Sequence, residues 1–254
     1  MLTDWRAGQD SNPRPGGPKP PAFVRRIGAN VSRNGSRPRL LDLFCGAGGA
    51  AVGYARAGFE VIGVDIVLQP HYPFEFHQAD ALTFPLDGFD AIHASPPCQR
   101  YSEGGRRFLK VQESHPDLIR PIRDRLVASD TPWVLENVRG ARKQLPNAAT
   151  ICARSMGLPR MARHRLFETP WLLFVPPCAC PQATETTIGV YGERPDGRIL
   201  NSRYPKARAP KGLAEAQEVM GMDWADWYGT KEAIPPAYTE WIGRQLLAAI
   251  AVAA

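Results

Sequence analysis

The segment Arg39-Leu-Leu-Asp-Leu-Phe44, with Cys45-Gly-Ala-Gly-Gly49 directly after it, decides the fold of this chain. Its first half is a short apolar run that predicts a buried strand, and its second half is a tight glycine-rich turn. Residues Ala50 to Ala57 then predict a helix that ends at Gly58. A strand, a glycine turn and a helix in this order are typical of the opening of a doubly wound, mostly parallel α/β fold.

The glycine turn can hold a ligand, because it lets a ligand approach the backbone and the helix N-terminus offers free N–H groups. Gly46, Gly48 and Gly49 do not have the spacing Gly-x-Gly-x-x-Gly, which disfavours a dinucleotide cofactor. The next predicted strand ends in Asp65, about twenty residues after the turn, where an acid can accept from ribose hydroxyls. Taken alone, Asp65 could equally end a strand at the surface. The segment ending in Asp80 repeats the pattern and could receive an adenine amino group.

A third apolar run, Phe89 to Ala94, leads into Ser95-Pro-Pro-Cys-Gln-Arg-Tyr-Ser102. The two prolines have no N–H to donate to a sheet, so they force the chain out of it and present Cys98 at the mouth of a pocket. A cysteine off the carboxyl end of a strand is a candidate nucleophile, whereas the commoner fate of a free cysteine is a small buried core residue. This stretch by itself leaves the two alternatives open.

A carboxylate stands inside the next apolar run, Pro132-Trp-Val-Leu-Glu-Asn-Val138. A charged group in such a run is costly unless it is paired or functional, so we expect a functional role for Glu136. Ligands in these folds bind outside the carboxyl ends of the strands. Glu136 and Cys98 are therefore expected to be neighbours at that edge of the sheet.

The chain after residue 115 also predicts another strand and three helices. In the run that ends at Glu168, strand alternation places Arg163 and Arg165 on one face and His164 on the other, where a structural role is expected. Apolar spacing and helix-start signals predict helices over residues 117–129, 212–221 and 238–252.

The length of 254 residues and an apolar content of 44% fit one large domain, or one domain with a small insertion. No run approaches the length of a membrane span, and the N-terminus lacks the apolar core of a secretory signal. Five cysteines at irregular spacing indicate free thiols in a reducing cytoplasm. Cys178-Ala-Cys180 resembles half a zinc site, but no second Cys/His pair stands at a usual spacing, so no metal is predicted.

The formal net charge of +6 comes entirely from residues 1–39, because the rest of the chain is formally neutral. Residues 1–38 are rich in proline and glycine and predict a disordered basic tail, which could bind phosphates or be dispensable. Residues 99–115 are basic and glycine-hinged, as in a lid or binding loop, although a merely solvated loop has the same composition. Residues 181–212 are also locally basic, with interleaved tyrosines, and a recognition element is expected there.

Taken in order, these motifs resemble those of the DNA cytosine-5 methyltransferase family, from about Leu40 to Ala248. A single motif of this kind would be weak evidence for the family, but five or six motifs in the family's order are specific for it. Two features depart from the family pattern: Glu232-Ala233 stand where a Gly-Asn pair is usual, and the recognition region is short, as in small enzymes of phages and mobile elements. The matching segments are Asp42-Leu-Phe-Cys-Gly-Ala-Gly-Gly49, Pro96-Pro-Cys-Gln-x-x-Ser102, Glu136-Asn-Val138, Arg163-x-Arg165, Glu215-Ala-Gln-Glu-Val-Met-Gly221 and Ile234-Pro-Pro-Ala-Tyr238.

The resemblance implies a Rossmann-like methyltransferase domain, formed by residues 39–168 and 213–254, with target recognition in residues 169–212. Its cofactor would be S-adenosylmethionine, without a metal, and its target a cytosine flipped out of the duplex. Cys98 would attack C6, Glu136 would hold N3, Arg165 would hold O2, and Arg163 would support that corner. The implied cofactor-binding residues are Asp42, Phe44, Cys45, Gly46, Gly48, Gly49, Asp65, Ile66, Asp80, Ala81 and Pro96, and the implied DNA-binding residues are Gln99, Arg100, Ser102, Arg106, Arg107, Arg194, Arg198 and Arg203.

We also expect local positive charge and exposure to favour ionisation of the Cys98 thiol, and burial to raise the pKa of Glu136. The expected partner is double-stranded DNA, for a monomer in the cytoplasm of a bacterium or phage-infected cell, with a cognate restriction nuclease as a further partner in a restriction-modification system. Two alternatives stay open. A tRNA cytosine-5 methyltransferase is disfavoured by the basic, tyrosine-containing segment, and an inactive nucleic-acid-binding homologue by the presence of Cys98 and Glu136.

Overall fold

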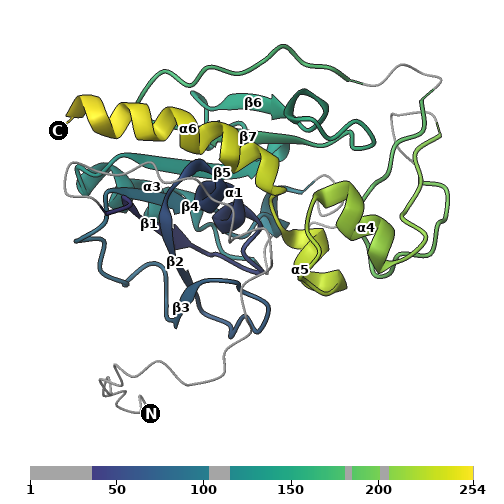
Figure 1. The fold of residues 1–254 in the computed structure, drawn as a ribbon, viewed down its shortest axis with the longest axis horizontal. Helices are drawn as coiled ribbons and strands as arrows, with labels where there is room; N and C mark the ends of the chain where they lie inside the picture. The colour runs from purple at the N-terminus through teal and green to yellow at the C-terminus, as the bar shows by residue number, and fades with distance from the viewer. Residues whose placement is uncertain (1–35, 103–114, 181–184, 201–205, 254) are drawn as a thin grey trace.

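The protein is described here from a computed structural model, which describes residues 36–102, 115–180, 185–200 and 206–253 (Figure 1). Within these residues the chain forms one sheet of seven strands in the order β3-β2-β1-β4-β5-β7-β6. The predicted doubly wound, mostly parallel sheet is therefore confirmed. The strands are β1 (Arg39–Leu43), β2 (Glu60–Asp65), β3 (Glu75–Gln78), β4 (Ala91–Ala94), β5 (Trp133–Val138), β6 (Ala149–Cys152) and β7 (His164–Glu168).

The first five strands run parallel, and β7 pairs antiparallel with both β5 and β6. The strand order reverses at β1, whose Leu43 is paired with Val64 of β2 on one side and with Ala94 of β4 on the other. A reversal of this kind opens a crevice at the carboxyl ends of the strands, where such folds bind ligands. The register thus brings the glycine turn and the Pro-Pro-Cys segment to one place.

Helices cover both faces of the sheet. On one face α1 (Gly49–Ala57) packs against the long α6 (Pro236–Ala253), as Figure 1 shows, and on the other lies α3 (Ile119–Ala128). The contact between α1 and α6 is so close that a Cβ on Gly53 would lie 2.0 Å from Thr239 Oγ1, so only glycine fits there. The remaining helices are α4 (Leu213–Met220) and α5 (Trp227–Glu232), with short 3₁₀ turns η2 (Gln99–Tyr101), η4 (Arg139–Ala141) and η5 (Arg154–Met156).

The three helices predicted over residues 117–129, 212–221 and 238–252 are present as α3, α4 and α6. Two short elements had no clear sequence signal. Strand β6 has only four residues, and α5 has six and contains Gly229, whose N–H donates to the Oδ1 of the capping Asp226 at 2.8 Å. Strands and helices of this length contain too few residues to show a periodic pattern of apolar side chains in the sequence.

The predicted recognition region is irregular in its described parts, residues 169–180, 185–200 and 206–212, which contain isolated bridges but no regular strand or helix. Arg208 makes both bridges, one to Ile188 and one to Ile199. Ile188 and Val190 are buried in the core that α1 and α6 share, so this region packs onto the sheet domain. Among the described helices, none combines the length and apolar character that crossing a bilayer requires.

Candidate active site

A cavity of about 1560 Å³ opens at the carboxyl ends of the central strands. It brings together most of the residues that the sequence singled out. Those lining it are Asp42, Phe44, Cys45, Gly46, Gly49, Asp65, Ile66, Asp80, Ala81, Pro96, Cys98, Gln99, Ser102, Glu136, Arg163 and Arg165.

Four described candidates do not line this cavity. Gly48 lies just behind the turn as the N-cap of α1, and Arg100 donates to the carbonyl of His115 at 2.9 Å. Arg194 and Arg198 are exposed, and both lie near Asp196, at 3.8 and 3.3 Å. Arg106, Arg107 and Arg203 lie outside the described residues, as do residues 1–35 of the predicted tail.

The glycine turn is held in shape by Asp65. One carboxylate oxygen of Asp65 accepts from the N–H of Gly46 and the other from the N–H of Val67, each at 3.0 Å. Gly48 has φ +82° and a Cβ there would lie 2.7 Å from Pro73 Cδ, so both conformation and space require glycine. The exposed apolar side chains of Ile66 and Val67 flank the cavity here and offer a surface for a flat ring.

Asp42 is a buried acid in this part of the cavity. Its side chain is fully buried, and neither carboxylate oxygen has a hydrogen-bond partner among the described residues. Burial and the charge of Asp65 hold the pKa of Asp42 well above its ordinary value, while the nearby Tyr72 hydroxyl acts in the opposite direction. A buried, unsatisfied carboxyl is costly, and a cationic ligand would supply the missing donors.

The Pro-Pro-Cys segment leaves the sheet as predicted and is tied to β5. Asn137 is fully buried and donates from Nδ2 to the carbonyl oxygen of Pro96 at 2.8 Å. Cys98 follows as the N-cap of η2 and is half-buried. Sequence reasoning missed the role of Asn137, although its place next to Glu136 in the quoted motif was a usable signal.

The expectation that local charge and exposure favour ionisation of Cys98 was wrong for this structure. Burial and the Glu136 carboxylate raise the pKa of the Cys98 thiol, and Arg165 and Arg163 offset this only in part. Desolvation of the thiolate outweighs the attraction of the two guanidinium groups.

The side chain of Glu136 is part of the cavity wall. It is 4% exposed, and Oε1 is 3.1 Å from Arg165 Nε in an ion pair that lacks the alignment of a hydrogen bond. Burial raises the pKa of Glu136 to about 7, against the opposing effects of Arg165, a hydrogen bond with Ser95, and Arg163. The predicted rise in the pKa of Glu136 is thus confirmed, and at neutral pH this carboxyl group can either give or take a proton.

A chain of side chains extends behind Glu136. The ring of the fully buried His93 lies between Tyr54 Oη, at 2.9 Å from Nδ1, and Ser95 Oγ, at 2.7 Å from Nε2. Burial lowers the pKa of His93 to about 3, so this imidazole is neutral. It orients Ser95, and through it Glu136, without adding charge.

Arg163 and Arg165 both reach the cavity, as alternation predicted, but they are used differently. Arg163 donates to the carbonyls of Val190 at 2.5 Å and Ala233 at 3.2 Å, and so joins the predicted recognition region to the segment before α6. Burial and the charge of Arg165 lower the pKa of Arg163 to about 10. Arg165, by contrast, faces Glu136.

Residues 39–152 match the model of the C-5 cytosine-specific DNA methylase family, so the predicted resemblance to that family is confirmed over this part of the chain. No curated protein sequence matches the chain. Three solved structures of similar fold are a prophage-encoded E. coli protein described as a DNA modification methyltransferase (15% identity, TM-score 0.53), Entamoeba histolytica methyltransferase EhMeth (12%, 0.55) and S. pombe Dnmt2 methyltransferase (13%, 0.53). Each of these alignments covers 85% of this chain and 99% of the matched structure's chain. At such low sequence identities, the similarity shows only that the chain has the methyltransferase fold.

Proposed function

We propose that this relative of the C-5 cytosine methyltransferases transfers a methyl group from S-adenosylmethionine to C5 of a cytosine in double-stranded DNA. The observation that carries the proposal is the meeting of Cys98, Glu136 and Arg165 in one cavity with the unsatisfied carboxyl of Asp42. A nucleophile, a group near its pKa at neutral pH and a fixed cation suit attack on a neutral heterocycle.

The cavity fits the proposed cofactor, which supplies a methyl group on a positively charged sulfur when bound. Asp42 offers two unpaired oxygens to an ammonium group. The backbone from Phe44 to Gly49 lines the space beside them, and Asp65 retains lone pairs for ribose hydroxyls. Ile66 offers an apolar face to an adenine ring, and the exposed Asp80 lies at the same rim with Ala81 and Pro96.

In the proposed reaction, the sulfur of Cys98 forms a bond to C6 while Glu136 gives its proton to N3, which leaves C5 nucleophilic. Methylation of C5 is followed by loss of the C5 proton to solvent or a bound water. The C5–C6 double bond then re-forms as the bond from C6 to sulfur breaks and N3 returns its proton to Glu136. Arg165 is in place to bind the cytosine O2, next to Glu136.

The coupled ionisation of Cys98 and Glu136 supports this sequence. The Glu136 charge is one cause of the raised pKa of Cys98, and that charge disappears when Glu136 is protonated. The reactive form is therefore protonated Glu136 with the Cys98 thiolate. Protonated Glu136 with the Cys98 thiolate and ionised Glu136 with the neutral Cys98 thiol each hold one proton. The pKa values seen in a titration therefore belong to the pair of groups and not to either residue alone.

DNA is the proposed substrate. A base inside a duplex cannot reach Cys98, so the target must be flipped out. Gln99 and Ser102 line the cavity mouth, and the exposed Arg194 and Arg198 could contact phosphates. We further propose that the chain acts as a monomer in the bacterial or phage-infected cytoplasm, with a cognate restriction nuclease as its expected companion.

Trapping on 5-fluorocytosine tests the proposal, because fluorine at C5 cannot leave as a cation and the adduct persists. The protein is incubated with S-adenosylmethionine and duplex DNA containing 5-fluorocytosine, and then separated on a denaturing gel. A covalent complex is expected for the wild type and none for Cys98→Ala.

Each other result has a definite meaning. An adduct with 5-fluorocytosine tRNA and none with any DNA would make the chain a tRNA methyltransferase. No adduct with either, from a folded protein that binds S-adenosylmethionine, would overturn the catalytic proposal. Bisulfite sequencing of DNA from expressing cells would then identify the target sequence.

A further inference from the structure

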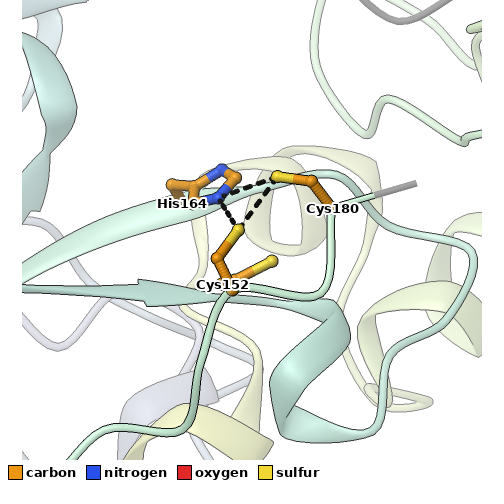
Figure 2. Close-up of side chains that lie close together, drawn as sticks. Cys152, His164 and Cys180 are labelled. Atoms are coloured by element: carbon orange, nitrogen blue, oxygen red, sulfur yellow. Dashed lines mark hydrogen bonds between the residues drawn. The ribbon is translucent and has the colours of Figure 1, made fainter. Parts of the chain in front are cut away.

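Three cysteines and one histidine meet outside the cavity. Cys152 is the last residue of β6 and His164 the first of β7, and the antiparallel register pairs them directly. Cys178 and Cys180 lie on the segment that follows β7 and returns over these strand ends. Figure 2 shows Cys152, His164 and Cys180 close together, and its dashed lines mark the contacts among His164, Cys178 and Cys180.

The spacing of the side-chain atoms suits a metal ion. Cys178 Sγ is 3.0 Å from Cys180 Sγ, and His164 Nε2 is 3.3 and 3.4 Å from these two sulfurs. One ligand atom from each of the four residues lies within 4.8 Å of all the others. Tetrahedral zinc, with Zn–S of about 2.3 Å and Zn–N of about 2.0–2.1 Å, would hold its ligand atoms about 3.5–3.8 Å apart. An increase of less than about 1 Å in each of these three separations would reach this geometry.

We propose that Cys152, His164, Cys178 and Cys180 bind one zinc ion as a closed structural site. Three thiolates and an imidazole are the softer ligands that select zinc, and a set of four protein ligands leaves no open position for catalysis. The site would carry a net charge of −1. Arg139 and Arg142 line a cavity of about 380 Å³ together with His164, Cys178 and Cys180, and would balance that charge.

The prediction that the protein has no metal site depended on spacing along the chain, where no second Cys/His pair accompanies Cys178 and Cys180 at a usual spacing. The folded structure provides such a pair. Cys152 and His164 are twelve residues apart in the sequence, yet strand pairing makes them neighbours. The structural role expected for His164 would therefore be coordination of the zinc ion.

The ion would connect two functional parts of the molecule. His164 stands between Arg163 and Arg165, so its coordination would fix the end of β7 from which both arginines reach the cavity. Cys178 and Cys180 would hold the beginning of the recognition region against the same strands. The zinc site itself does not depend on the proposed methyl transfer, since it needs only these four residues.

Metal analysis of the full-length, untagged protein tests the site. Protein purified from zinc-supplemented cells without chelators is expected to contain one zinc per chain by mass spectrometry of the elements. Cys178 is exposed and Cys180 is on the same loop, so Cys178→Ser with Cys180→Ser should keep the fold by circular dichroism. This double variant should lose more than the roughly 10–100-fold in zinc affinity that is typical of removing only an outer partner.

Cobalt provides a spectroscopic readout independent of activity. Addition of Co²⁺ to the reduced metal-free protein should produce sulfur-to-cobalt charge-transfer bands and the visible bands of tetrahedral cobalt. Cys98→Ser is the matched control: it removes another thiol, abolishes adduct formation, and should retain full zinc content and the cobalt spectrum.

The proposal is overturned if the folded, reduced wild type takes up neither metal. It is equally overturned if the double variant binds as tightly as the wild type, or if the protein forms a Cys178–Cys180 disulfide and stays metal-free after reduction. Failure of DNA trapping with intact zinc binding would count against the methyl-transfer proposal alone.

Discussion

Among the described residues, two groups of carboxyl side chains behave differently: the buried Asp42 and Glu136, and the half-buried Glu215. Asp42 and Glu136 line the cavity. Both oxygens of Asp42 and the Oε1 of Glu136 lack a hydrogen-bond partner among the described residues, and burial raises the pKa of each group. Glu215, at the start of α4, is fully engaged. It accepts from Arg208 at 2.6 and 2.8 Å, from the N–H of Lys211 at 2.7 Å, and pairs with Arg160.

The contrast separates groups prepared for a ligand from groups that hold the fold. Hydrogen bonds from Arg208 are the main cause that lowers the pKa of Glu215 to about 2, with Lys211 N–H and Arg160 contributing. Glu215 therefore stabilises the fold through partners within the protein and needs no ligand. Burial of the unpartnered oxygens of Asp42 and of Oε1 of Glu136 has a free-energy cost, which a bound molecule that donates hydrogen bonds to them would offset. Substitutions of these carboxyls should therefore separate activity from stability.

Glu136→Gln should have the largest effect. Loss of a positioned proton donor is expected to lower kcat on cytosine-containing DNA by about 10²–10⁴-fold. The free energy of unfolding near pH 7 should not fall, because the substitution removes a buried charge. Steady-state transfer of labelled methyl groups and urea denaturation measure the two quantities. A large loss of stability with little change in kcat would assign Glu136 to the fold.

The pH profile sharpens this prediction. With Glu136 titrating near pH 7 and Cys98 at higher pH, kcat/KM of the wild type should rise as pH increases toward 7 and then level off. The Gln variant cannot titrate, so its kcat/KM should continue to climb above pH 7 as Cys98 ionises. Identical profiles for the two proteins would contradict the shared-proton description.

Asp42→Asn should weaken S-adenosylmethionine binding by about 10–100-fold, the value of a hydrogen bond to a charged group. The unliganded variant should unfold at a higher temperature than the wild type, since a buried carboxyl with unsatisfied oxygens is removed. Isothermal titration calorimetry and thermal unfolding test the pair of effects. Unchanged affinity with lowered stability would make Asp42 a packing residue.

Glu215→Gln should show the opposite pattern, with a loss of about 2 kcal/mol in the free energy of unfolding at pH 7 and a small change in kcat. Because the folded-state pKa of Glu215 lies below its ordinary value of 4.5, the wild-type advantage exists above that pH. It should disappear as pH falls from 4.5 to about 2. Denaturation at pH 7 and pH 2 measures this; a difference between wild type and variant that is as large at pH 2 as at pH 7 would refute it.

Glu240→Gln is the surface control with the smallest expected effect. Glu240 pairs with Arg244 one helical turn away on α6, and the arginine side chain is 65% exposed. Such a pair contributes about 0.3–0.5 kcal/mol, and salt should screen it. Unfolding at low and high ionic strength checks this, and a loss comparable to that of Glu215→Gln would remove the distinction drawn between the two sites.

Most of the cavity could be predicted from the sequence because its parts are local. The strand and glycine turn at 39–49, the two prolines before Cys98 and the carboxylate in β5 each carry their signal in a few consecutive residues. Parallel strands bring such strand-end features to one edge of the sheet. Sequence patterns thus indicated which residues would meet, and the family match and the cavity agree with that prediction.

What the tertiary structure alone decided depends on distance through space rather than along the chain. The Asn137 bond to Pro96 joins segments 41 residues apart, and the balance between burial and two arginines sets the ionisation of Cys98. The antiparallel pairing of β6 with β7 brings Cys152 to His164, and the returning segment adds Cys178 and Cys180. No local pattern encodes these contacts, because residue type and spacing do not specify which strands pair or how much water a packed site excludes.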